Sequence, residues 1–308
     1  MKVLLTGAAG QLGHALRRRC PPGVELIATA RSGVAGSPEG AVAGHAQGEV
    51  VALDLADAEA CRAAVHRHRP DWVLNAGAYT AVDRAESEAE LAHAVNAGAP
   101  RAFAEALRET GGALLQLSTD FVFNGEQGHP YRPEQPRQPL GVYGASKAAG
   151  EEAVEQLLGG AGGRGVILRT SWVIGPVGHN FARTMLRLHG ERPEIAVVAD
   201  QVGCPTSTAT LAEACWRAIS LPTPPPILHW SDAGAASWYD VAVAVGELAV
   251  ELGQLERAAR VRPITTADYP TPARRPSYSL LACSACRTAL GLEPLHWRAA
   301  LRQVLAAW

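Results

Sequence analysis

Short apolar runs alternate with longer segments of helical periodicity along the first 175 residues. The apolar runs lie at 2–6, 25–30, 50–55, 71–78, 113–119 and 166–175. Segments of helical length separate them, most clearly at 57–69, at 86–108 and after residue 141. Strands that are apolar on both faces suit a parallel sheet covered by helices, and strand–helix alternation supplies its connections. The pattern therefore predicts an α/β fold with a doubly wound parallel sheet of the Rossmann type.

The strict alternation stops after Gly175-Pro176. Helices are predicted at 180–189, 207–220, 237–252 and 295–308, joined by a loop at 200–206 and a Pro-rich connector at 222–226. We interpret 1–175 as a nucleotide-binding domain that carries the catalytic residues. Residues 176–308 would form mainly a smaller substrate-binding region, with sheet and substrate parts interleaved.

The first apolar run leads directly into a glycine-rich turn that opens a helix. Glycines in such a turn let the backbone approach a pyrophosphate, which lies on the helix N-terminus. The spacing alone is a weak signal, but its place between the first strand and the first helix favours a dinucleotide site. The predicted cofactor contacts here are Gly7, Gly10, Gln11, Leu12 and Gly13.

The residue after the second strand bears on the choice of cofactor. A fold that selects NAD usually has Asp or Glu there, whereas this chain has Arg31, which suits a 2′-phosphate. NADPH is therefore the predicted cofactor, with NADH as the alternative, although Arg31 could equally be one of many solvated arginines. Further cofactor contacts are predicted after the third and fourth strands, at Asp54, Leu55, Ala76, Gly77 and Ala78.

Tyr143 and Lys147 are four residues apart, which places them on one face of a helix. An ammonium beside a phenol favours the phenolate, so we expect a lowered pKa for Tyr143 and a role in proton transfer. Lysine is rare here, because Lys2 and Lys147 are the only two among 28 Lys and Arg residues. Arg is a poor substitute for a compact ammonium, which argues against a chance surface pair.

Thr119 ends the fifth predicted strand. Sheets of this class bind ligands at the carboxyl ends of their strands, so Thr119 is predicted to hydrogen-bond a substrate oxygen beside Tyr143. The alternative is a local turn in which the hydroxyl only closes the strand.

Charge and composition narrow the functional classes. A net charge of −2 over 308 residues makes nucleic acid and anionic membranes poor partners. The opening apolar run is too short for a signal peptide and no segment reaches membrane-spanning length, so a cytoplasmic location is expected. Only Cys283 and Cys286 have the spacing of metal ligands, without a second pair, and no metal site is predicted.

Together these motifs resemble the extended, nucleotide-sugar-modifying branch of the short-chain dehydrogenase/reductase superfamily. Within it they are most similar to the dTDP-4-dehydrorhamnose reductases. The resemblance covers essentially the whole chain, and its motifs are specific in combination rather than singly. They lie at 6–13, 75–86, 118–125, 142–147, 169–173, 180–186 and 200–206.

The resemblance implies NADPH-dependent reduction of the 4-keto group of dTDP-6-deoxy-L-lyxo-4-hexulose to dTDP-L-rhamnose. Hydride would come from the nicotinamide C4 and the proton from Tyr143, with Lys147 on the nicotinamide ribose and Thr119 orienting the ketone. The implied substrate-binding residues are Thr80, Thr119, Trp172, Asn180, Gln201 and Arg275, the last as a pyrophosphate partner.

Three positions depart from the family pattern. Phe121 replaces a usual Tyr, the segment 275–282 lacks the usual Asn and Asp and ends at Ala282, and Gly77 replaces a commoner Ala. Other readings are a reductase, epimerase or dehydratase for another nucleotide sugar, or a non-catalytic regulatory subunit with this fold. The missing acidic residue after the second strand counts against enzymes that recycle NAD. A homodimer is compatible with the sequence, which does not fix the oligomeric state.

Overall fold

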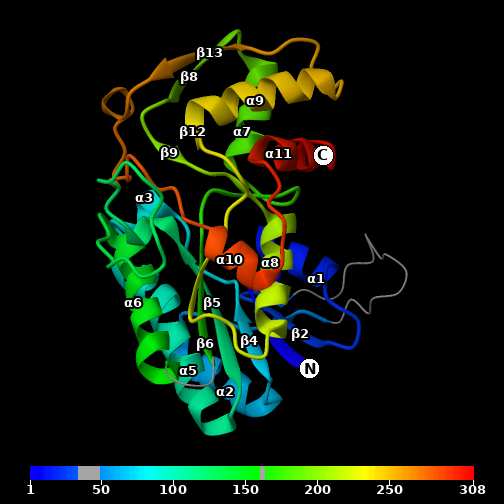
Figure 1. Cartoon of the computed structure of the whole chain (residues 1–308), viewed down its shortest axis with the longest axis vertical. Coiled ribbons are helices and arrows are strands. Elements are labelled where there is room, and N and C mark those ends of the chain that lie inside the picture. The colour runs from blue at the N-terminus through cyan, green and yellow to red at the C-terminus, as the bar shows by residue number, and fades with distance from the viewer. Residues whose placement is uncertain (34–48, 160–163) are drawn as a thin grey trace.

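A seven-stranded parallel sheet forms the centre of the molecule (Figure 1). The computed structural model describes residues 1–33, 49–159 and 164–308. The strand order is β11-β6-β5-β4-β1-β2-β3, and every neighbouring pair runs parallel. The strands are β1 (Lys2–Thr6), β2 (Glu25–Ala30), β3 (Val51–Ala52), β4 (Trp72–Asn75), β5 (Ala113–Thr119), β6 (Gly165–Thr170) and β11 (Ile227–His229). The predicted doubly wound sheet is confirmed, and its order reverses between β1 and β4, where such sheets bind ligands.

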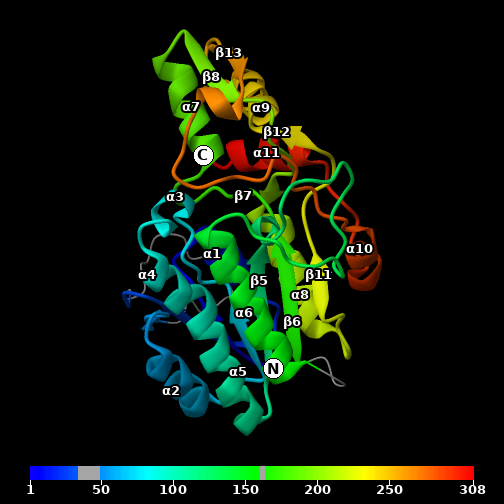
Figure 2. The ribbon, with the colours of Figure 1, turned by 90° about the vertical axis from the view of Figure 1, so that its left-hand side faces the viewer.

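Helices cover both faces of the sheet. On one face lie α2 (Ala58–His68), α5 (Ala99–Thr110) and α6 (Val142–Leu158), which are seen together in Figure 2. On the other lie α1 (Gln11–Arg18), α8 (Thr208–Ser220) and α10 (Ser284–Leu290). Neighbouring residues of β1 point to opposite faces of the sheet. Leu4 packs against α2, α5 and α6, whereas Val3 and Leu5 pack against α1, α8 and α10.

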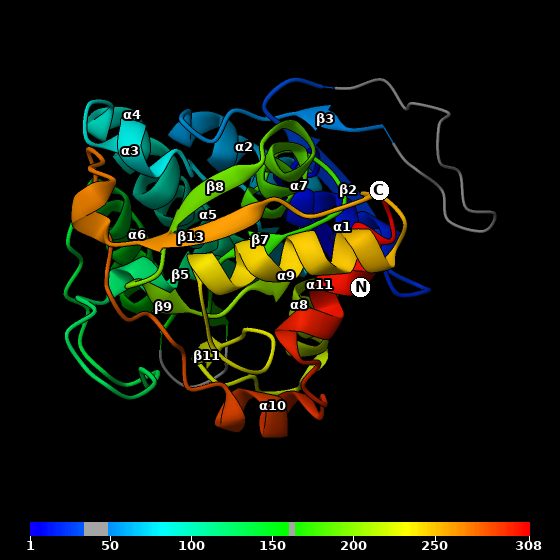
Figure 3. The same ribbon diagram turned by 90° about the horizontal axis from the view of Figure 1, so that it is seen from above.

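A smaller layer lies beyond the carboxyl ends of the strands, and Figure 3 views it from above. Its core is formed around α7 (Phe181–Glu191), α9 (Trp238–Glu251) and α11 (Trp297–Leu305). The parallel strands β8 (Glu194–Val198) and β13 (Arg260–Ile264) pack on them. The pattern did not predict these two strands, because β13 is largely exposed and contains Pro263, a residue that argues against a strand.

The short elements complete the chain. Helical turns are α3 (Val82–Ala85), α4 (Ala89–His93), the π-helix η1 (Ala94–Gly98), and the 3-10 turns η2 (Asp120–Val122) and η3 (Thr266–Asp268). Short strands are β7 (Val173–Ile174), β9 (Val202–Gly203), β10 (Thr206–Ser207) and β12 (Ala236–Ser237). No helix within the described ranges is both long and apolar enough to cross a membrane.

Two predicted elements are subdivided. The helix predicted at 86–108 is observed as α4, η1 and α5, and the strand predicted at 166–175 is observed as β6 and β7. Trp172 separates the two strands with a φ of 46°. The predicted division into two regions at residue 175 stays a prediction. The hydrophobic core of the sheet includes residues from both sides of it, because Leu211, Trp216 and Leu228 pack with β1.

Candidate active site

The glycine-rich turn after β1 touches the loop after β4. Gly7 has a φ of +66°, and a Cβ there would lie 2.7 Å from the Cα and N of Gly77. A Cβ at Gly13 would lie 2.1 Å from the carbonyl oxygen of Gly7. Side chains at these positions would therefore overlap with backbone atoms, so the close packing of the turn requires glycine at both. Gly10 closes the turn by donating its N–H to Gly7 O at 2.9 Å.

The N-terminus of α1 is available to an anion. Gly10 is its N-cap, no side chain in the described part of the chain caps it, and its first turn has no acidic residue. Its first N–H groups therefore provide the partial positive charge that binds a phosphate. Leu12 is partly buried against the sheet core and anchors this turn.

Gln11 and Asn180 meet across 169 positions of the chain. Asn180 Nδ2 donates to Gln11 Oε1 at 2.9 Å and to Gly175 O at 2.9 Å. Asn180 Oδ1 accepts from the N–H of Arg183 at 3.0 Å and so caps α7. These two predicted ligand contacts thus also join the nucleotide turn to the substrate layer.

The other predicted cofactor residues surround this turn. Arg31 and Asp54 are exposed at the carboxyl ends of β2 and β3. Leu55 packs toward the loop 76–78, where a Cβ on Gly77 would lie 2.4 Å from Leu55 Cδ1. The commoner Ala would require a shift of the flexible Leu55 side chain and small adjustments of Gly7 N and Thr6 Oγ1, each 3.2 Å from that Cβ. Thr6 fixes the loop, because its Oγ1 accepts from Gly77 N at 3.0 Å.

Thr119, Tyr143 and Lys147 lie at the carboxyl end of β5 and the start of α6. Lys147 is buried, and its Nζ donates to Leu117 O at 2.6 Å. Thr119 Oγ1 donates to Asp120 Oδ1 at 3.0 Å and accepts from Phe121 N at 3.2 Å. The Tyr143 ring packs edge-on against Phe121, with centroids 5.7 Å apart, so the departure at 121 contacts the predicted proton donor.

The predicted lowering of the Tyr143 pKa was wrong. Burial raises the pKa of Tyr143 to about 12, with the Thr119 side chain opposing and the Asp120 charge adding to the rise. Burial also lowers the pKa of Lys147 to about 8, against the nearby charge of Glu151. The ammonium is directed to Leu117 O, so it does not offset the burial of the phenol. A phenol that keeps its proton at neutral pH suits a proton donor.

Asn96 was not predicted, and it connects the loop after β4 with α6. It is 1% exposed in the π-helix η1. Its Nδ2 donates to Tyr79 O and to Ser146 Oγ, both at 3.0 Å, and its Oδ1 accepts from Tyr79 N at 2.9 Å. Ser146 Oγ in turn donates to Tyr143 O at 2.8 Å. The sequence signal that could have identified Asn96 is an Asn within an apolar helical segment, because Asn is disfavoured in helix interiors.

The predicted substrate residues have defined partners. Trp172 stacks on Trp238 with centroids 3.6 Å apart and an interplanar angle of 8°. Gln201 is buried and donates to Thr266 Oγ1 at 3.0 Å. Thr80 is exposed in the loop before α3. Arg275 forms an ion pair with Asp83.

The segment 275–282, which departs from the family pattern, ties several loops together. Val202 N donates to Ser277 O, and Ser279 N donates to Val202 O, both at 2.8 Å. Ser277 Oγ donates to Gly125 O at 2.9 Å. Ala282 N donates to Tyr131 O at 2.8 Å. The loop 200–206 is thereby fixed against the loops that follow β5.

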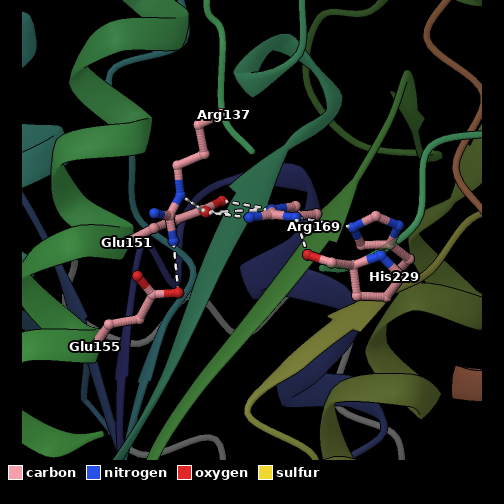
Figure 4. Close-up of polar contacts among 6 residues, drawn as sticks. Arg137, Glu151, Glu155, Arg169 and His229 are labelled. Carbon is pink, nitrogen blue, oxygen red and sulfur yellow. Dashed lines mark hydrogen bonds and ion pairs between the residues drawn. The ribbon is translucent and has the colours of Figure 1, made fainter. Parts of the chain in front are cut away.

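A buried ion-pair network lies one helical turn beyond Lys147 (Figure 4). Arg169 donates to both oxygens of Glu151, at 2.7–3.2 Å, and both side chains are essentially unexposed. Arg137 also donates to Glu151 at 2.6 Å and pairs with Glu155 at 2.6 Å. Burial would raise the pKa of Glu151, but the two arginines hold it below its ordinary value.

His229 extends this network to β11. Burial and the Arg169 charge lower the pKa of His229 to about 3, so its ring is neutral. Arg169 Nη1 then donates to His229 Nε2 at 3.2 Å, which leaves Nδ1 to donate to Tyr131 O at 3.0 Å. The network therefore links α6, β6, β11 and the loop before α6.

Comparisons with known proteins identify the family. A family model described as the RmlD substrate binding domain matches residues 1–308. The chain is 44% identical over 311 residues to a dTDP-4-dehydrorhamnose reductase of Streptomyces griseus, covering 99% of this chain and 93% of that protein. The chain belongs to the dTDP-4-dehydrorhamnose reductase family.

The chain is also similar to a second Streptomyces protein and to a solved structure. A Streptomyces antibioticus protein described as a probable dTDP-4,6-dihydroxy-2-methyloxan-3-one 4-ketoreductase is 41% identical, covering 98% of this chain and 94% of that protein. A dTDP-4-dehydrorhamnose reductase of Bacillus anthracis, solved in complex with NADP, has a TM-score of 0.82 and 31% identity, covering 98% of each chain. Both similarities cover 98% of this chain and so extend through both layers of the fold.

Proposed function

We propose that this protein reduces the 4-keto group of dTDP-6-deoxy-L-lyxo-4-hexulose to give dTDP-L-rhamnose, with NADPH as cofactor. The observation that carries the proposal is that Thr119 ends β5 while Tyr143 and Lys147 share the start of the helix α6, in a chain of this family. The protonated Tyr143 phenol donates its proton to the oxygen that becomes the new hydroxyl. Thr119 orients the ketone once its hydroxyl proton turns from Asp120 Oδ1 to the ketone oxygen, and Lys147 binds the nicotinamide ribose once it leaves Leu117 O.

The residues around the turn fit a dinucleotide. The glycine turn, the N-terminus of α1, which no described side chain caps, and the exposed Arg31 together suit a pyrophosphate and a 2′-phosphate. When bound there, NADPH supplies the hydride. The assigned contacts are Gly7, Gly10, Gln11, Leu12, Gly13, Arg31, Asp54, Leu55, Ala76, Gly77, Ala78, Tyr143 and Lys147.

The substrate side is assigned to the second layer. Trp172 and Thr80 are proposed to contact the sugar. Asn180 and Gln201 are proposed to contact the substrate through their side-chain amides, which hydrogen-bond to Gln11 and Thr266 in the structure. Arg275 is proposed to bind the pyrophosphate. Residues 176–308 mainly serve substrate binding in this proposal, and 1–175 bind the cofactor. Cytoplasmic location and a homodimer stay predictions.

The test is NADPH oxidation with enzymatically generated dTDP-4-keto-6-deoxyhexulose, with the GDP-linked 4-keto-6-deoxy sugar as control. Turnover of the dTDP sugar alone, with dTDP-L-rhamnose as product, is the expected result. A different dTDP-deoxysugar product would assign a sibling 4-ketoreductase, which the Phe121 and Ala282 departures favour as the second candidate. Cofactor binding without turnover of either sugar would contradict the proposal and favour a regulatory protein.

A further inference from the structure

Asp120 is a buried carboxylate that has no assigned role, although it directly follows Thr119. It begins η2 at the carboxyl end of β5, and only 2% of its surface is exposed. Oδ1 accepts the hydrogen bond from Thr119 Oγ1 at 3.0 Å. Oδ2 is fully buried and has no hydrogen-bond partner among the described residues. Burial raises the pKa of Asp120 to about 6, although the side chains of Ser279 and Thr119 and nearby backbone N–H groups oppose the rise. The buried carboxylate therefore costs folding free energy, so its presence beside the reaction centre points to a function.

The hydrogen bond to Asp120 fixes the hydroxyl of Thr119. A hydroxyl has one proton to donate, and Thr119 directs it to Asp120 Oδ1. The N–H of Phe121, in the η2 turn that follows, donates to the same Thr119 Oγ1 at 3.2 Å. Thr119 is thus held in one orientation beside Tyr143, and Asp120 is the side chain that determines this orientation.

The charge of Asp120 acts on Tyr143. Three charged side chains approach the start of α6: Asp120 from η2, Lys147 from α6 itself, and Glu86, whose Oε1 accepts from Val142 N at 2.9 Å. Lys147 is directed to Leu117 O. Of the three, Asp120 is the charge that raises the pKa of Tyr143, adding to the larger effect of burial. A negative charge beside a phenol disfavours the phenolate and so keeps the proton in place.

We propose that Asp120 is a positioning residue of the active site, which holds the Thr119 hydroxyl until the ketone oxygen accepts its hydrogen bond and keeps Tyr143 protonated until the ketone oxygen takes the proton. This is the state that a reduction requires of its acid. In the same way, Asp120 would disfavour the reverse direction, in which the tyrosinate acts as a base.

The direct test titrates Tyr143 by NMR in protein labelled at the tyrosine Cζ, with NADP⁺ present. The Tyr143 resonance is identified by its loss in Tyr143→Phe. Asp120→Asn, which keeps the size of the side chain, should lower the midpoint of Tyr143 by about one pH unit. Asp232→Asn is the matched control. Asp232 is equally buried and burial likewise raises its pKa, but its carboxylate accepts from Ser207 N at the start of α8 and not from Thr119. An unchanged midpoint in Asp120→Asn would overturn the proposal, whether or not the sugar substrate is correctly assigned.

A second readout rests on the proposed function. With the 4-keto sugar, the alkaline limb of kcat/KM should move to lower pH in Asp120→Asn, while the control keeps the wild-type limb. A uniform loss of rate with an unmoved limb would mean that Asp120 only supports the fold locally. Inactivity of the wild-type protein on this sugar would refute the proposed substrate and leave the NMR result intact.

Discussion

Arg275 binds both carboxylate oxygens of Asp83, with Nη1–Oδ1 at 2.9 Å and Nη2–Oδ2 at 2.8 Å, across 192 positions of the chain. The pair joins α3, which contains Asp83, to the first residue of the segment 275–282. The Arg275 side chain holds the pKa of Asp83 below its usual range. The proposed pyrophosphate partner is therefore paired with a protein carboxylate, for which a substrate phosphate is a natural competitor.

Arg275→Gln should raise the KM for the dTDP sugar about tenfold and change kcat little, because a ground-state anion contact is removed. Asp83→Asn should not raise KM, since it frees Arg275 for the substrate. Arg274→Gln is the control, because Arg274 is the exposed neighbouring arginine. Steady-state kinetics with saturating NADPH measure this. An unchanged KM in Arg275→Gln would remove Arg275 from the binding site.

Gly7→Ala should weaken NADPH binding more than tenfold. The new methyl group would lie 2.7 Å from the backbone of Gly77, and the φ of +66° is itself strained for Ala. Gly23→Ala is the matched control, because Gly23 has a φ of +80° but nothing within 4 Å of a Cβ. Fluorescence titration with NADPH measures both variants. Equal affinities in the two would show that the contact between the turn and the loop after β4 does not shape the cofactor site.

Arg169→Met should destabilise the protein by about 3–5 kcal/mol, because it leaves the charge of Glu151 buried with only Arg137 as its cationic partner. The exposed pair of Arg187 and Glu191 gives the comparison, and Arg187→Met should cost at most about 0.5 kcal/mol. Urea unfolding measures both free energies. Similar small losses in both variants would mean that the network contributes little beyond its packing.

Asp120→Asn should stabilise the fold at neutral pH. Burial raises the pKa of Asp120 from 3.8 to about 6, so the folded chain binds this proton more tightly than the unfolded chain does. Wild-type stability is therefore lost as pH rises from about 4 to 6 and is constant above, whereas the Asn variant lacks this loss. The variant should gain up to ~3 kcal/mol at pH 7.5 and almost none near pH 4. Urea unfolding at both pH values decides this, and a variant less stable than wild type at pH 7.5 would contradict the raised pKa.

The features that the sequence predicted correctly are those encoded within a few neighbouring residues. Buried strands are continuous apolar runs, and the turn from Gly7 to Gly13 lies within one strand–helix junction. The strand pair β8 and β13 was missed because its partners are 66 residues apart and one contains Pro263. The same reason hid the pairing of Arg275 with Asp83, since no local pattern marks a partner so distant.

The electrostatics of the site were less predictable than its residues. The spacing of Tyr143 and Lys147 indicated their shared helix face, but the pKa of Tyr143 depends on its burial and on where Lys147 Nζ finds an acceptor. Both depend on tertiary packing. Asn96 and Asp120 were overlooked for a similar reason, because their importance lies in buried hydrogen bonds that only the folded chain creates.

The most direct test of the proposed chemistry is the rate of NADPH oxidation by Tyr143→Phe with the dTDP-4-keto-6-deoxy sugar, measured beside its affinity for NADPH. The substitution removes the proton donor and keeps the ring that packs on Phe121. We predict that kcat falls by about 10²–10⁴-fold while the Kd for NADPH changes by less than about twofold. Turnover within a few-fold of the wild-type rate would contradict the assignment of Tyr143 as the acid.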